Sequence, residues 1–190
     1  MTNDYLNSAK KMFAYYKILG EKTFEQLKEK DFSWQYNSES NSIATIVKHL
    51  RGNMVSRWTD FLYSDGEKSS RNRDDEFENN LRTKEEIINL WNEGWQCSMA
   101  ALESLSVEDL TREIYIRNQG YKVVDAVNRQ LAHYAYHVGQ IVFIGKMICN
   151  DRWQSLSIPK GKSVQYNKDK FASPKHGEHF TDELLKGKKD

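Results

Sequence analysis

Two histidines four residues apart, His133 and His137, are the residues whose type and spacing point most directly to chemistry. In a helix, side chains at positions i and i+4 lie on the same face one turn apart, so both imidazoles could bind one ion. The same spacing also follows from helix periodicity alone, which leaves an ordinary pair of packed histidines as the alternative. A third ligand would decide between these two interpretations.

His49 is the one further histidine inside a predicted helix, whereas His176 and His179 lie in a polar C-terminal stretch and are expected to be solvated. On a helical wheel His49 falls just beyond the apolar stripe, a position that also suits a surface histidine. Three neutral imidazoles would suit a borderline divalent cation such as zinc or nickel. They would leave coordination positions open, as catalytic metal sites do.

Three polar residues stand at helical steps from which they could orient the ligands or a substrate, namely Asn53, Arg129 and Gln140. A surface or packing role is equally open for each. The stretch from His133 to His137 lacks the glutamate that follows the first histidine of a zincin-type protease, so it does not support that mechanism. Tyr134 is predicted to be a core residue, and no general base is identifiable.

Apolar residues at spacings of three and four predict four amphipathic helices that would position these residues. The helices are expected from Leu6 to Leu27, about Ser42 to Tyr63, about Lys84 to Leu105, and Lys122 to about Asn150. Alternation over residues 113–117, before a turn at 118–120, predicts a small β-hairpin. Residues 64–80 hold little to bury and are predicted to form an exposed loop. We expect an all-α four-helix bundle with this hairpin before helix four and an irregular C-terminal extension.

Composition and charge place few constraints on the function of this chain. The chain holds 28 basic and 27 acidic residues, a net charge of +1, which gives no electrostatic reason to expect a nucleic-acid or membrane partner. The spacing of its two cysteines does not indicate a disulfide scaffold, which favours a location in the reducing cytoplasm. We expect no signal peptide, because the first residues hold no basic segment followed by an apolar run, and no run of roughly 20 apolar residues is present. We therefore expect a cytoplasmic protein with one domain at residues 1–166 and a polar tail at 167–190.

Three segments together resemble the DinB-like superfamily, also called the YfiT-like metal-dependent hydrolases. The first is QLAHYAYHVGQ, from Gln130 to Gln140, which carries the paired histidines on the fourth helix. The second is IVKHL, with His49 midway along the second helix, where that family has its first ligand. The third is WQSLSIPKG, from Trp153 to Gly161, which is similar to the C-terminal signature of an uncharacterised subgroup of bacilli. The resemblance covers about residues 6–166.

The resemblance implies a four-helix bundle, often a homodimer, with a metal site at His49, His133 and His137. Characterised branches include S-transferases that use a low-molecular-weight thiol such as bacillithiol, and mycothiol-dependent isomerases. It therefore implies a metal-dependent S-transferase or hydrolase that acts on a small molecule, with a divalent metal and such a thiol as cofactors. A non-catalytic, dimeric metal-binding or stress-associated protein is the alternative, because the sequence identifies no general base.

Overall fold

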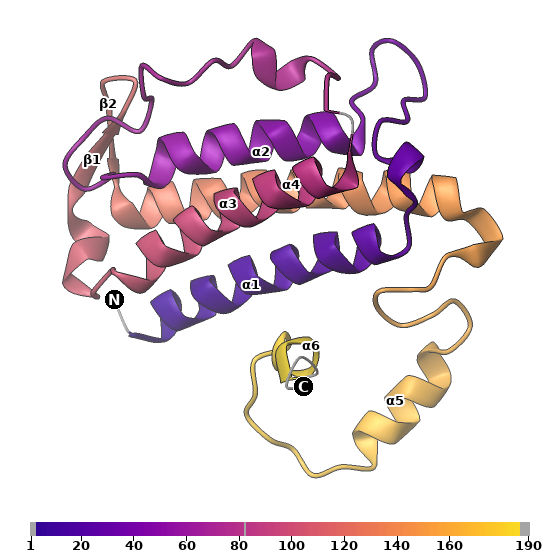
Figure 1. Cartoon of the computed structure of the whole chain (residues 1–190). Coiled ribbons are helices and arrows are strands. Elements are labelled where there is room, and N and C mark those ends of the chain that lie inside the picture. Colours follow the sequence, from indigo (N-terminus) through magenta and orange to yellow (C-terminus); the bar gives the residue numbers. More distant parts are fainter. Residues whose placement is uncertain (1–2, 82, 187–190) are drawn as a thin grey trace.

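The described residues, 3–81 and 83–186 of this computed structural model, are mostly helical, and four long helices account for most of the helical residues. These are α1 (Asn3–Glu25), α2 (Ile43–Trp58), α3 (Lys84–Glu103) and α4 (Val123–Cys149). They lie side by side (Figure 1), with α1 packed on α4 and α3, and α2 packed on α3 and α4. Short 3-10 helices occur at η1 (Glu29–Asp31), η2 (Asp75–Phe77), η3 (Glu108–Thr111) and η4 (Asn150–Arg152).

The ends of the helices follow from local capping. Ser42 caps α2, its hydroxyl accepting a hydrogen bond of 3.1 Å from the Thr45 amide, and Thr83 begins α3 in a capping box. The second helix ends at Trp58, earlier than predicted. The reason is that Thr59 adopts extended backbone and Asp60 has a positive φ of 48°, which α-helical continuation does not allow.

A two-stranded antiparallel hairpin precedes α4, as predicted. Its strands are β1 (Glu113–Ile116) and β2 (Gln119–Lys122). The turn lies at Arg117 and Asn118, whose φ angles of 56° and 59° are those of a two-residue hairpin turn. The Asp65 carboxylate accepts both turn amides at 2.8 Å, which fixes the chain after α2 to the hairpin.

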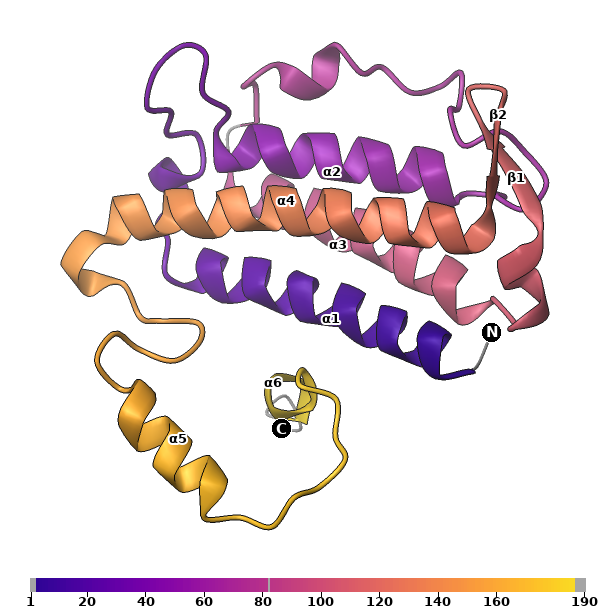
Figure 2. The same ribbon diagram turned by 180° about the vertical axis from the view of Figure 1, so that it is seen from behind.

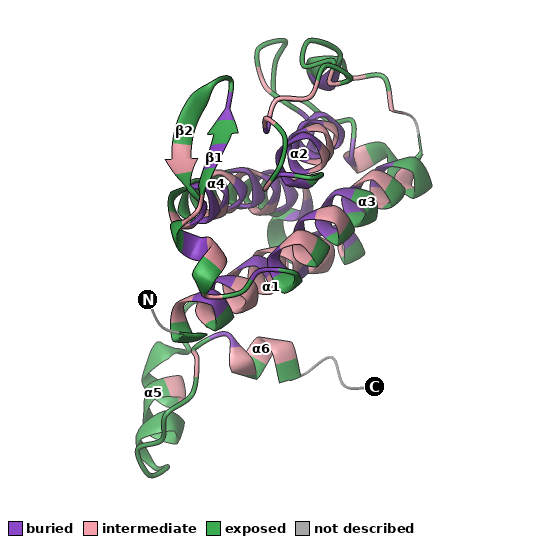
Figure 3. Cartoon of the chain, turned by 90° about the vertical axis from the view of Figure 1, so that its left-hand side faces the viewer, coloured by how far each residue is buried: buried purple, intermediate pink, exposed green. Residues whose placement is uncertain are grey.

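Large aromatic side chains fill the space between the four long helices. Buried residues are purple on the ribbon of Figure 3. Phe13 of α1 makes edge-to-face contacts with Trp95 of α3 and with Tyr134 of α4, at centroid distances of 6.4 and 5.6 Å. All three rings are fully buried. This packing fixes the rotation of α4 about its axis, and it therefore fixes the direction in which the neighbouring His133 and His137 point.

Residues 64–80 were expected to form an exposed loop, and this expectation is wrong for part of the segment. The segment passes along α2 (Figure 2), and η2 packs against that helix. Glu76 is only 4% exposed, and Gly66 is also buried. A charged side chain that was expected in solvent thus lies against the helix that carries His49.

The C-terminal extension is more regular than predicted, because it contains α5 (Ser163–Phe171) and α6 (Asp182–Lys186). α6 packs against α1. His179, expected to be solvated, lies 3.0 Å from the Ser8 hydroxyl through Nε2 and is half-buried. Residues 187–190 of the predicted tail lie outside the described residues. Within the described ranges, no helix is both long and apolar enough to cross a membrane.

Candidate metal centre

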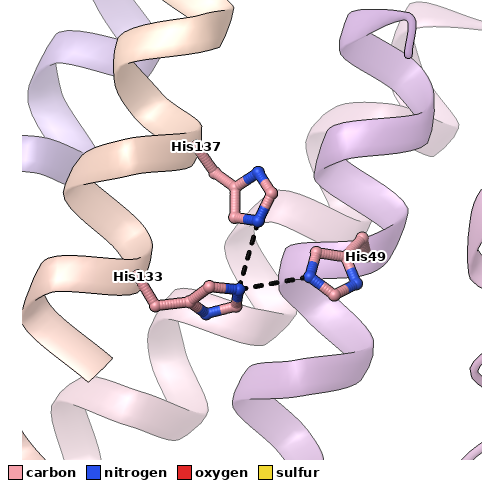
Figure 4. Close-up of side chains that lie close together, drawn as sticks. All are labelled: His49, His133 and His137. Atoms are coloured by element: carbon pink, nitrogen blue, oxygen red, sulfur yellow. Dashed lines mark hydrogen bonds between the residues drawn. The ribbon is translucent and has the colours of Figure 1, made fainter. Parts of the chain in front are cut away.

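The structure brings His49, His133 and His137 together between α2 and α4 (Figure 4). The Nε2 atom of His133 lies 3.1 Å from Nε2 of His137 and 3.3 Å from Nε2 of His49. One ligand atom from each ring lies within 4.8 Å of the other two. His49, whose wheel position also suited a surface residue, is only 5% exposed. The three histidines therefore form one largely buried cluster.

The outer nitrogens of two rings have hydrogen-bond acceptors. His49 Nδ1 lies 2.9 Å from Oε2 of Glu76, and His137 Nδ1 lies 3.0 Å from Oε1 of Gln140. A carboxylate and an amide oxygen only accept hydrogen bonds, so each Nδ1 carries the proton and donates it. In the neutral rings, the Nε2 atoms of His49 and His137 consequently present lone pairs toward His133.

Without a cation, this arrangement cannot be satisfied by hydrogen bonds alone. Neutral His133 carries at most one proton on Nε2, yet that atom faces two lone pairs, so at least one of these lone pairs has no proton directed to it. Protonation of these neutral imidazoles to the charged form is disfavoured. Burial, followed by the neighbouring histidines, lowers the pKa of His133 to about 3, and burial with the nearby His49 lowers that of His137 to about 4.

A divalent cation among the Nε2 atoms would remove this conflict, and both separations that centre on His133 fit one. Imidazole nitrogens at about 2.0–2.1 Å from a tetrahedral zinc ion are about 3.3 Å apart. The two Nε2 separations centred on His133 are 3.1 and 3.3 Å. Nδ1 of His133 is buried and lacks a hydrogen-bond partner among the described residues, so this ring is the least fixed of the three. The donor set thus suits zinc or nickel.

Glu76 orients His49 and is itself held by Arg71. Nε and Nη2 of Arg71 donate to Oε1 and Oε2 of Glu76 at 2.7 and 2.8 Å, which is a bidentate ion pair. Burial works against the charged form of Glu76, but the hydrogen bonds from Arg71 and His49 outweigh it and lower the pKa of the carboxyl group. Glu76 therefore stays ionised. Hydrogen bonding of this kind from a carboxylate to a ligand histidine is typical of metal sites.

Gly52 makes the approach of Glu76 to His49 possible. It follows His49 by one turn of α2, and a Cβ atom at this position would overlap the Glu76 carboxylate. Sequence reasoning missed Glu76, Arg71 and Gly52, because a polar loop residue gives no sign of being buried. The sequence does hold one signal, a glycine inside a helix one turn from a histidine. Because glycine destabilises the interior of a helix, its presence there indicates a close contact with another part of the chain.

The three candidate orienting residues have different surroundings. Gln140 accepts the hydrogen bond from His137 and belongs to the cluster. Asn53 is buried but accepts a hydrogen bond of 3.2 Å from the Tyr134 hydroxyl instead. Arg129 is exposed and donates to the Tyr121 hydroxyl on the hairpin at 2.9 Å. Among the hydrogen bonds of the described residues, those of Gln140 alone of the three reach a histidine of the cluster.

Tyr134 is confirmed as a core residue. It is fully buried, and burial, the largest effect on it, raises the pKa of its hydroxyl. The hydroxyl accepts a hydrogen bond of 2.9 Å from Nε1 of Trp58 and donates to Asn53. Since both contacts are structural and the pKa is raised, Tyr134 is not suited to exchange protons with a substrate.

The sequence matches the family described as Protein of unknown function (DUF1572) over residues 1–162. This range contains all three histidines, Glu76 and Gln140. Neither curated proteins nor solved structures give a significant match. The family assignment therefore covers the candidate centre but carries no activity with it.

Proposed function

We propose that this chain, which belongs to the family of proteins of unknown function DUF1572, binds a divalent metal ion through His49, His133 and His137. We further propose that its four long helices form a DinB-like bundle that dimerises, and that it is a metal-dependent enzyme acting on a small molecule. The observation that carries the proposal is the convergence of three Nε2 atoms while two of the Nδ1 atoms have acceptors.

The charges around the cluster support a catalytic rather than a closed structural ion. The three ligands are neutral, and Glu76, the one ionised carboxylate in contact with them among the described residues, is paired with Arg71. These residues leave the charge of a bound ion largely uncompensated. When bound, the ion supplies Lewis-acid chemistry, lowering the pKa of a water or thiol nucleophile. Three protein ligands also leave coordination open, whereas structural zinc sites have four.

The reaction proposed is transfer of a low-molecular-weight thiol such as bacillithiol, with hydrolysis as the variant in which water replaces the thiol. The thiol sulfur forms a bond to an electrophilic carbon of the substrate. The leaving group departs with the electron pair of the broken bond, and the thiol proton passes to solvent. In this scheme Glu76 and Gln140 are positioning residues, because each acts through the histidine that it contacts.

Metal content tests the first part of the proposal. The full chain is purified without a chelating tag, and bound metals are measured by elemental analysis for wild type, His137→Ala and His176→Ala. His176 is a matched control because it lies exposed in the C-terminal extension. We expect close to one ion per chain in wild type and His176→Ala and a large loss in His137→Ala. Equal and negligible metal in all three would refute the proposed centre.

Turnover tests the second part. Metal-loaded and chelator-treated protein are each incubated with bacillithiol and a model electrophile, and conjugate formation is followed by mass spectrometry. We expect conjugation above the uncatalysed rate only with the loaded protein. A panel of ester and amide substrates tests the hydrolase variant in the same way. Metal binding without turnover in either assay would favour the non-catalytic metal-binding alternative.

A further inference from the structure

A second feature lies one helical turn from the histidine cluster. A groove of about 500 Å³ runs between the C-terminal half of α4 and the segment that precedes α2. Figure 2 shows this segment beside that half of α4. The groove is bordered by Ile46, one turn before His49, and by Gln140, one turn after His137. It therefore begins where both helices leave the cluster.

The groove is lined mainly by apolar side chains that the fold leaves exposed. Phe143 and Met147 lie one turn apart on α4 and are 62% and 41% exposed, and Trp34 faces them from the other wall. Among the described residues, Glu39 is the only charged one in the lining, and no basic residue takes part. Covering this surface with an apolar ligand group lowers the free energy, and the lining holds no basic side chain that would bind an anion.

Gln140 connects this groove to the histidine cluster. Its Oε1 atom accepts the hydrogen bond from His137, and the same side chain borders the groove. A molecule lying in the groove would therefore contact the residue that orients a metal ligand. Its other end would need to extend over roughly one helical turn, about 5 Å, to reach the Nε2 atoms.

We propose that this groove binds an uncharged apolar arm, preferably aromatic, of the small molecule whose reacting end lies at the three histidines. The inference rests on the proposed function, and it assigns the groove to the uncharged reactant and not to an anionic thiol. Volumes of this size, with aromatic walls and a few polar groups at one end, are typical of small-molecule sites. Continuity with the cluster through Gln140 favours this occupant over a second copy of the chain.

Two metal-binding probes of different length test the proposal. Acetohydroxamic acid has only a methyl group beside its chelating atoms, whereas phenylpropionohydroxamic acid carries a phenyl arm that can span one helical turn. Their dissociation constants are measured by calorimetry on zinc-loaded full-length protein. We expect the phenyl probe to bind roughly tenfold more tightly, the gain from burying one aromatic ring. Equal dissociation constants for the two probes would refute the proposed groove site but would not contradict the proposed metal centre.

Substitutions in the groove test whether its side chains supply the added affinity for the phenyl probe. Phe143→Ala and Met147→Ala should each reduce the preference for the phenyl probe several-fold and leave the affinity for acetohydroxamic acid unchanged. Both side chains are exposed, so the fold should persist, which circular dichroism checks. Phe171→Ala is the matched control, because Phe171 is an exposed phenylalanine of α5 outside the groove. A preference that survives both groove substitutions would place the arm elsewhere and overturn the proposal.

Two further outcomes are distinguishable. If neither probe binds the zinc-loaded protein, an open metal centre is absent, and the proposed function fails together with this inference. If Phe143→Ala converts a dimer to a monomer in analytical ultracentrifugation, and the phenyl arm adds no affinity, the groove is an interface between two copies. That result would also overturn the small-molecule site.

Discussion

His49 Nδ1 donates a hydrogen bond of 2.9 Å to Oε2 of Glu76, a residue 27 positions further along the chain. The bond fixes the tautomer of His49, so that Nε2 is left free to bind an ion. It also joins α2 to a segment that has little regular structure of its own. Two properties, metal affinity and stability, should therefore depend on the Glu76 carboxylate.

Glu76→Gln should lower both properties. The substitution keeps the size of the side chain but removes the charge that pairs with Arg71 and orients His49. Loss of such a partner typically reduces metal affinity about 10–100-fold, and breaking a buried ion pair costs about 3 kcal/mol. Competition with a chromogenic chelator measures the first effect, and denaturant unfolding measures the second. Glu93→Gln, which breaks an exposed pair with Arg51, should cost less than about 1 kcal/mol and leave metal affinity unchanged.

Gly52→Ala should destabilise the protein although alanine is the better helix former. The new Cβ would overlap the Glu76 carboxylate and displace it from His49, at a cost of about 1–3 kcal/mol. Gly139→Ala is the matched control, because it lies in α4 with nothing within 4 Å of the added atom. It should gain about 0.5–1 kcal/mol. Thermal unfolding with and without metal checks both, and equal stabilisation of the two variants would contradict the role given to Gly52.

Metal-free protein should lose stability between about pH 7 and about pH 5. The pKa values of His133 and His137 are lowered from 6.5 to about 3 and about 4 in the fold. Within this window the unfolded chain binds more protons than the folded chain, so the free energy of unfolding falls as the pH falls. Urea unfolding of chelator-treated protein at both pH values measures the slope. His133→Gln with His137→Gln should flatten it, and an unchanged slope would refute these pKa values.

Tyr134→Phe should lower the free energy of unfolding and leave the metal affinity unchanged. Removing the hydroxyl leaves the Trp58 indole N–H and the Asn53 side-chain oxygen without their shared partner, at a cost of about 1–3 kcal/mol. Tyr136→Phe is the control on the exposed side of the same helix and should change little. Denaturant unfolding and metal titration of both variants test this. Loss of metal binding in Tyr134→Phe without loss of stability would show that Tyr134 acts at the centre.

The sequence was informative wherever periodicity or capping decides structure. Spacing predicted the four long helices and the shared face of His133 and His137, and the alternation after η3 predicted the hairpin. The position of His49 was not fixed by its wheel angle, because burial on that side of α2 comes from the segment at 64–80. Glu76 was missed for the same reason. Its burial depends on Arg71 and Gly52 together, a relationship that no local pattern encodes.

That segment also bears on how fast an ion could enter or leave. Its described part holds no regular element longer than the three residues of η2, and the His49–Glu76 hydrogen bond joins it to the cluster. Lifting Glu76 from His49 requires this hydrogen bond to break but leaves the aromatic core intact, so it is a local opening and not global unfolding. The rate of metal exchange is therefore expected to follow this local opening and not global unfolding.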